Sequence, residues 1–307
     1  MTKRAVIVAI NDYSSQPPTD YFSWPNLGGC LSDAVSLESL LKDAFVFDET
    51  TVLTDAQATR ETILSSVRGM LDASTAGDVA AFCYAGHGGR LPSNPDDMND
   101  PANFRFYDCI VPYSGDYITD RDFAELAGSL DPSTVNFTLV MDSCHSGGLS
   151  QASPDSRIRS GPYSDDLVAT CVNLMDTVIP CGAVVPLGSS DFDGNVSQVT
   201  GDGNGIVCSV DDDKSFVAAA LATVLAACRY DEVDADNAGG RGHGGLTQAL
   251  LDVVSASNLQ ITHRALVDSL RDDMANSLGI AQTPTLLGQQ SRMDEYFLSP
   301  WSSSTPG

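Results

Sequence analysis

The sequence predicts an α/β fold with a mainly parallel central sheet and helices on both faces. Continuous apolar runs, typical of strands buried on both faces, alternate in the first half with segments whose apolar residues recur at helical spacing. Such alternation is typical of parallel strands joined by crossover helices. Apolar residues also make up 42% of the 307 residues, which excludes disorder of the whole chain.

The elements of the first half follow from their local patterns. Thr59, for example, is a candidate N-cap before a segment with Ile63, Val67 and Leu71 on one side. In chain order we expect strand 4–10, helix 30–45, strand 51–53, helix 59–71, strand 78–84, loop 90–104, strand 107–111, helix 119–130 and strand 136–141.

The pattern then dissolves into a long segment rich in serine, proline, glycine and aspartate, which is too long for an ordinary connection. We expect regular structure again at 215–228, a glycine-rich loop at 239–245, helices at 246–255 and 262–278, and a strand at 285–287. The predicted organisation is one domain made of a first part (1–150), an acidic insertion (151–213), a second part (214–300) and a disordered tail (301–307).

The charge is strongly acidic, with 41 Asp and Glu against 16 Lys and Arg and a formal net charge of −25. Such a field repels phosphate backbones, so we expect no nucleic-acid partner. It favours cationic partners, either metal ions or peptides with Lys or Arg, while most of the charge forms a solvated coat. No apolar stretch reaches the roughly 20 residues of a membrane span, so we expect no membrane partner.

The eight cysteines contain no CxxC pair, and several lie in apolar runs, as reduced core cysteines do. The first apolar run is short and continues directly into Asn11 and Asp12, unlike a cleavable signal peptide. These two features predict a reducing, cytoplasmic location.

Two glycine-flanked residues, His87 and Cys144, each follow the end of a predicted strand. In parallel sheets, catalytic groups gather at the carboxyl ends of strands. A thiol is a good nucleophile only as the thiolate, and a nearby imidazole can take its proton. We therefore predict a catalytic His/Cys dyad.

Five segments resemble metacaspases and their bacterial relatives in the caspase-like cysteine protease family. The paired motifs YAGHGG (84–89) and MDSCHSGG (141–148) are the most specific, and the other three are GGCLSDA (28–34), ACRYD (227–231) and GGLTQAL (244–250). His87 also precedes Cys144 by about fifty residues, the order found in caspases. The resemblance covers residues 3–150 and 215–298 and implies a caspase-like three-layer αβα sandwich with large-subunit-like and small-subunit-like parts.

The resemblance implies a role for each matching residue. Cys144 would be the nucleophile and His87 its general base, with the N–H groups of Gly88 and Cys144 as the oxyanion hole. Asp33 and Asp142 match the family's acidic specificity pocket, which implies cleavage of proteins or peptides after Arg or Lys. No cofactor is needed for this chemistry, and a monomer is implied.

Calcium stimulation stays open in the sequence. Asp108 and Asp120 match positions that hold calcium in many metacaspases, but Arg121 and Gln151 stand where the family has further aspartates. Calcium needs several oxygen ligands, so two losses weaken the site, although Asp122 could substitute for one of them.

The insertion separates the two subunit-like parts, and cleavable residues lie within it or directly after it. Arg157, Arg159 and Lys214 are therefore candidates for self-cleavage, although solvated charges would look the same.

Several features have two interpretations. Asp231 is a candidate substrate-binding residue. The acidic residues around it either extend the acidic pocket or face solvent, and the same two interpretations apply to Asp231, Glu232, Asp234 and Asp236. His243, in a second GHGG sequence, either lines the substrate cleft or lies in a plain loop.

Other functions also stay open. A catalytically silent caspase-like scaffold is the main alternative, although the intact His87 and Cys144 argue against it. A nucleotide-binding domain is a second alternative, but no phosphate-binding glycine motif follows the first strand.

Overall fold

The structure is a computed structural model. It describes residues 1–17, 24–92, 106–128, 130–131, 133–143, 196–199, 207–210, 222–228, 234–257, 260–288 and 292–301.

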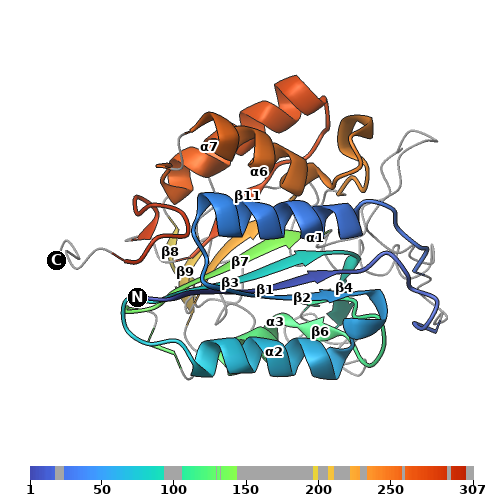
Figure 1. The fold of residues 1–307 in the computed structure, drawn as a ribbon, viewed down its shortest axis with the longest axis horizontal. Coiled ribbons are helices and arrows are strands. Elements are labelled where there is room, and N and C mark those ends of the chain that lie inside the picture. Colours follow the sequence, from blue (N-terminus) through green and yellow to red (C-terminus); the bar gives the residue numbers. More distant parts are fainter. Residues whose placement is uncertain are drawn as a thin grey trace.

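A six-stranded sheet forms the centre of the fold, and it confirms the predicted mainly parallel arrangement (Figure 1). Its spatial order is β11-β10-β7-β3-β1-β2, and only the pairing of β10 with β11 is antiparallel. The strands are β1 (Lys3–Ala9), β2 (Glu49–Thr54), β3 (Val79–Ala85), β7 (Asn136–Asp142), β10 (Thr223–Ala226) and β11 (Thr285–Leu287). Strands from both predicted parts of the chain therefore share one sheet.

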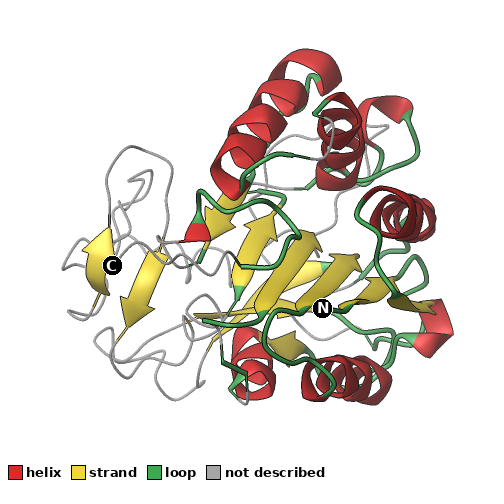
Figure 2. Cartoon of the chain, turned by 60° about the vertical axis from the view of Figure 1, so that its left-hand side comes forward, coloured by secondary structure: helices red, strands yellow, loops and turns green. Residues whose placement is uncertain are grey.

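Helices cover both faces of this sheet, as the sequence predicts (Figures 1 and 2). One face carries α1 (Cys30–Ser39), α6 (Gly245–Ala256) and α7 (His263–Asp273), and the other carries α2 (Arg60–Asp72) and α3 (Asp120–Ala127). Because both faces are covered, every residue of β3 and β7 is buried.

The helix ends follow from local hydrogen bonds. The hydroxyl of Thr59 accepts from the backbone N–H of Thr62, which confirms Thr59 as the N-cap of α2. Thr119 begins α3 in a capping box with Asp122, whose carboxylate accepts from the Thr119 N–H at 2.8 Å. Two predicted helices change character near their ends: α1 and α7 continue as π-helical turns at Leu40–Ala44 and Met274–Leu278.

Some strands lie where the sequence predicts a loop or no strand. The segment expected to begin a loop at residue 90 is instead part of β4 (Gly88–Pro92), which pairs with β5 (Phe106–Ile110) and, through it, with β6 (Ile118–Thr119). Within the predicted insertion, β8 (Val196–Val199) and β9 (Val207–Val210) form a separate antiparallel pair. Each of these strands is too short to give a clear pattern in the sequence. Hydrogen bonds to a neighbouring strand hold them in place.

Within the described part of the chain, no helix is both long enough and apolar enough to cross a membrane.

A buried histidine makes stability depend on pH. His263, the first residue of α7, is 1% exposed, and burial lowers its pKa to about 4, although its hydrogen bonds to backbone groups act in the other direction. Above pH 6.5 the ring is neutral in both the folded and the unfolded chain. As the pH falls from 6.5 towards 4, only the unfolded chain takes up the proton, so the folded state loses stability, by about 3 kcal/mol in total.

We therefore expect the stability advantage of the wild type over His263→Gln to shrink by about 2 kcal/mol between pH 7 and pH 5. Urea unfolding of both proteins across this range measures the difference in stability. The contributions of all other titrating groups are the same in both proteins and cancel in this difference. Parallel pH dependences of the two proteins would contradict the assignment.

Candidate active site

The two predicted catalytic positions follow neighbouring strands in register. β3 and β7 are parallel partners, and Ala85 pairs with Asp142. His87 and Cys144 each come two residues after these paired positions. Cys144 lies outside the described residues, so its role stays a prediction. His87 is described, and it is fully buried at the carboxyl end of β3.

The imidazole of His87 is oriented by a segment that precedes α1. Its Nε2 lies 2.7 Å from the carbonyl oxygen of Pro25. Because a carbonyl only accepts hydrogen bonds, Nε2 must carry a proton, so Nδ1 is the basic nitrogen of the neutral ring. The rings of Trp24 and Tyr13 pack against the imidazole, with centroids at 5.2 and 4.5 Å.

Nothing in the sequence marks Pro25, because a backbone carbonyl can come from any residue type. The packing of Trp24 and Tyr13 against the imidazole is not marked in the sequence either. Tyr13 follows the first predicted strand, and its position after a buried run is the one signal that could have suggested it.

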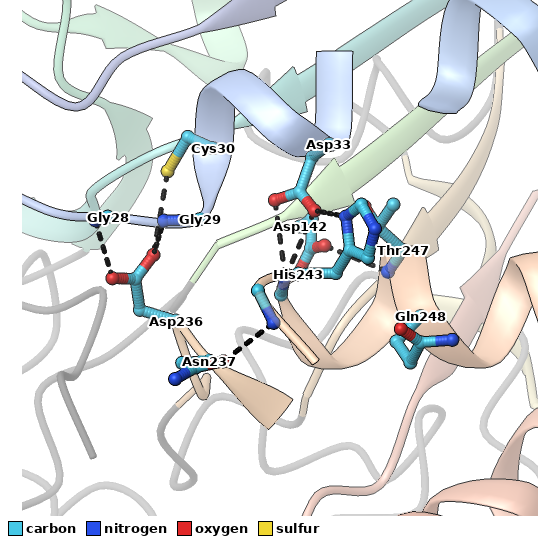
Figure 3. A network of polar contacts seen from close by, with 12 residues as sticks. Gly28, Gly29, Cys30, Asp33, Asp142, Asp236, Asn237, His243, Thr247 and Gln248 are labelled. Carbon is cyan, nitrogen blue, oxygen red and sulfur yellow. Dashed lines mark hydrogen bonds and ion pairs between the residues drawn. The ribbon is translucent and has the colours of Figure 1, made fainter. Parts of the chain in front are cut away.

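The two aspartates of the predicted specificity pocket lie at the N-terminus of the same helix (Figure 3). Asp33 of α1 accepts hydrogen bonds from the N–H of Gly244, the N-cap of α6, at 3.1 and 3.3 Å. Asp142, the last residue of β7, accepts from the N–H of Thr247 in the first turn of α6 at 2.8 Å. Both side chains are fully buried. The helix dipole and free N–H groups stabilise carboxylates at such an end.

His243 contacts one of these two aspartates, Asp33. Its Nδ1 lies 3.0 Å from Oδ1 of Asp33, while its side chain is still 18% exposed. This contact joins the loop of His243 to α1, and the interpretation that His243 lines the substrate cleft stays a prediction.

Two other acidic residues of this region, Asp234 and Asp236, are described and buried. Asp236 is buried and accepts from the N–H groups of Gly28 and Gly29, at 2.7 and 3.0 Å, at the start of α1. Asp234 is also buried and accepts from the Gln282 amide at 2.7 Å. These two carboxylates do not face solvent: they join the 234–245 segment to α1 and to residue 282. Asp231 lies outside the described residues.

The two candidate calcium positions each adjoin the last pair of β5 and β6. Cys109 of β5 pairs with Thr119 of β6, and the pairing ends there because Asp120 begins α3. The carboxylate of Asp122, in contrast, is held by Arg60 at 2.6 Å and by the Thr119 cap. Burial alone would raise the pKa of Asp122, but these hydrogen bonds lower it. These contacts occupy the Asp122 carboxylate and argue against Asp122 as a substitute calcium ligand.

Among the residues that the structure describes, no three His, Cys, Asp or Glu side chains form a cluster suited to a metal ion. The candidate cleavage sites Arg157, Arg159 and Lys214 lie outside the described residues.

Comparison with known proteins identifies the family. A family model described as the caspase domain matches residues 2–295. Metacaspase-9 of Arabidopsis thaliana is 29% identical over 314 residues, which cover 90% of this chain and 94% of that protein. Metacaspase-4 of the same plant is 35% identical over 156 residues, covering 48% of this chain and 34% of that protein.

Among solved structures, the fold is similar to that of protein GSU0716 from Geobacter sulfurreducens, with a TM-score of 0.62 at 18% identity, covering 98% of this chain and 100% of that chain. At this identity the likeness concerns the fold alone. The family match extends over nearly the whole chain and its curated relatives are metacaspases, so the chain belongs to the caspase-domain family and is a metacaspase-like cysteine peptidase.

Proposed function

We propose that the protein is an endopeptidase that cleaves after Arg or Lys, with His87 and Cys144 as its catalytic dyad. One observation supports this choice above others: Asp33 and Asp142 are both buried at the N-terminus of α6, and Asp142 ends the strand that precedes Cys144. Two adjacent carboxylates in a buried site favour a cationic side chain, which forms charge-assisted hydrogen bonds there.

In the proposed mechanism, Nδ1 of His87 accepts the proton of the Cys144 thiol. The thiolate attacks the substrate carbonyl, a C–S bond forms, and the N–H groups of Gly88 and Cys144 bind the oxyanion. His87 then gives its proton to the leaving amine as the C–N bond breaks. Water, deprotonated by His87, hydrolyses the thioester and regenerates the thiol. This chemistry needs no cofactor.

Backbone geometry supports Gly88 as an oxyanion donor. Gly88 pairs with Ile110, and the Val111 N–H donates to the His87 carbonyl at 3.0 Å. This places Gly88 in a non-hydrogen-bonded pair, so its own N–H points away from β5. The Gly88 N–H is therefore directed out of the edge of the three-stranded sheet β4-β5-β6.

The experiment that tests this function is a panel of fluorogenic peptides that differ only in the residue before the scissile bond. We expect turnover with Arg and Lys and none with Asp. Turnover of the Asp peptide alone would overturn the proposed specificity, and no turnover of any peptide by the folded protein would favour the catalytically silent scaffold.

We expect the enzyme to cleave itself after Arg157, Arg159 or Lys214, because each is a cationic residue within the insertion or directly after it. Mass spectrometry of the purified wild type should show these fragments, and the Cys144→Ala variant should stay intact. Identical fragments in both proteins would instead identify a contaminating protease.

For calcium, the proposed site is the end of the β5–β6 pair, where positions 108 and 120 adjoin the last paired residues, Cys109 and Thr119. Activity in the presence of a chelator, compared with activity at millimolar calcium, tests stimulation. An Asp108→Asn variant then tests this location.

For oligomeric state, we propose a monomer, which sedimentation measurements test.

A further inference from the structure

Two buried tyrosine hydroxyls lie beside the backbone of His87. Tyr13 follows β1, and Tyr84 belongs to β3. The His87 N–H donates to the Tyr13 hydroxyl at 2.7 Å, and the two hydroxyls lie 3.3 Å apart. The Tyr84 hydroxyl donates to the carbonyl oxygens of His87 at 2.7 Å and of Val111 at 3.0 Å. Both sides of the His87 backbone are therefore bound by the same pair of phenols.

The direction of every proton in this circuit is fixed by chemistry. Carbonyl oxygens only accept, so Tyr84 must donate its proton to them. Tyr84 can then take part in the contact with Tyr13 only as an acceptor, so Tyr13 donates to it. Tyr13 in turn accepts from the His87 N–H. The hydrogen bonds therefore run in one direction, from the His87 N–H through both hydroxyls to the His87 carbonyl.

This circuit also fixes the amide of the next residue. The His87 carbonyl accepts from both Tyr84 and the Val111 N–H, so both of its lone pairs are occupied. The peptide bond between His87 and Gly88 is trans and planar, and its N–H therefore points opposite to this carbonyl. Holding the carbonyl thus holds the direction of the Gly88 N–H, which is the proposed oxyanion donor.

The surroundings leave the circuit little freedom. Tyr13 and Tyr84 are 1% and 0% exposed, and burial raises the pKa of both phenols well above the usual range, so they stay protonated donors. At Gly86, between Tyr84 and His87, a Cβ atom would come within 2.5 Å of both hydroxyl oxygens. Only glycine lets the chain pass the two hydroxyls at this distance.

We propose that Tyr13 and Tyr84 are positioning residues that preset the oxyanion hole by holding the peptide unit between His87 and Gly88. The inference rests on the proposed function, because it gives the Gly88 N–H a task only if the protein cleaves peptides through Cys144. It adds two residues whose hydroxyl groups act through the backbone of His87 and not on the substrate. Their effect should appear in the transition state, where charge develops on the oxygen, and not in ground-state binding.

The test compares two reactions of Cys144 in wild type, Tyr84→Phe, Tyr13→Phe and the double variant. A peptide aldehyde ending in arginine forms a hemithioacetal, in which a C–S bond forms and the former carbonyl oxygen occupies the oxyanion hole. Iodoacetamide alkylates the same sulfur by displacing iodide and creates no oxyanion. Mass spectrometry of the Cys144 peptide follows the alkylation.

We expect Tyr84→Phe to weaken aldehyde binding and to lower kcat for the arginine substrate, each about tenfold, with KM and the alkylation rate nearly unchanged. Because the hydroxyls act as one circuit, the double variant should lose little more than the worse single variant. Tyr296→Phe, at a half-exposed tyrosine (49% exposed) outside the site, is the control and should behave as wild type.

Equal losses in aldehyde binding and in alkylation would show a general disturbance of the site and overturn the proposal, as would no loss in either. Since both reactions are measured on the same molecules, partial unfolding lowers them together and is recognised as such. If the wild type itself fails to react with the aldehyde while Cys144→Ala cleaves as wild type does, the proposed function fails rather than this inference.

Discussion

Replacing either Cys144 or His87 by alanine should lower kcat for an arginine substrate by at least about 10³-fold, the largest effect we expect from any single substitution. Cys144→Ala removes the nucleophile. His87→Ala removes the group that the Pro25 carbonyl orients with its Nδ1 as the basic nitrogen. Because the two act as a unit, the double variant should be no slower than the worse single variant. Initial rates at saturating substrate measure this directly.

The matched control is a cysteine of the same sheet. Cys83 in β3 is buried, and burial raises the pKa of its thiol to about 12, so it cannot be the nucleophile at neutral pH. Cys83→Ala should therefore keep full turnover per folded molecule. A Cys144→Ala protein that still cleaves the substrate at the wild-type rate would contradict the dyad.

The second large effect concerns specificity. Asp33→Asn or Asp142→Asn should lower kcat/KM for Arg and Lys substrates about 100-fold, the order of magnitude for removing one charge of a buried ion pair. The amide oxygen of asparagine can still accept the hydrogen bonds from Gly244 or Thr247 that the structure shows. The fold should therefore survive, while the new NH₂ group cannot accept a hydrogen bond from the substrate's cation.

A carboxylate at the opposite end of the sheet provides the control for this result. Asp78, just before β3, is also buried and accepts from the N–H groups of Thr2 and Thr75. Asp78→Asn should cost stability and leave the preference for Arg and Lys unchanged. If the Asp33 and Asp142 variants also keep their kcat/KM, these aspartates do not bind the cationic side chain.

The core of the fold could be predicted because its signal is local. The runs that became β1, β3 and β7 are continuously apolar, and burial on both faces of a parallel sheet requires that composition. Strand β4 escaped prediction because its pairing with β5 is a contact between segments separated along the chain. The π-helical turn after α1 escaped too, since its residues have ordinary helical composition.

The same distinction applies to the site. His87 could be named from the sequence because it is flanked by glycines after a predicted strand, and Asp33 and Asp142 because they lie in motifs that resemble those of metacaspases. The Pro25 carbonyl and the amides of Gly244 and Thr247 are backbone groups, and every residue has them. The Tyr13–Tyr84 contact joins residues 71 positions apart, so only the folded chain brings the two hydroxyls together.

The position of β10 beside β7 has a consequence for the integrity of the molecule. The segment between these strands joins two neighbours of one sheet, and Asp236 further ties the second part to the start of α1. A cut between residues 144 and 221 breaks none of these hydrogen bonds. The chain connection there acts as a tether that raises the effective concentration of one half for the other. Severing it would leave two polypeptides whose lifetime as a pair is set by their shared interface, so the halves, produced separately, should be able to complement each other.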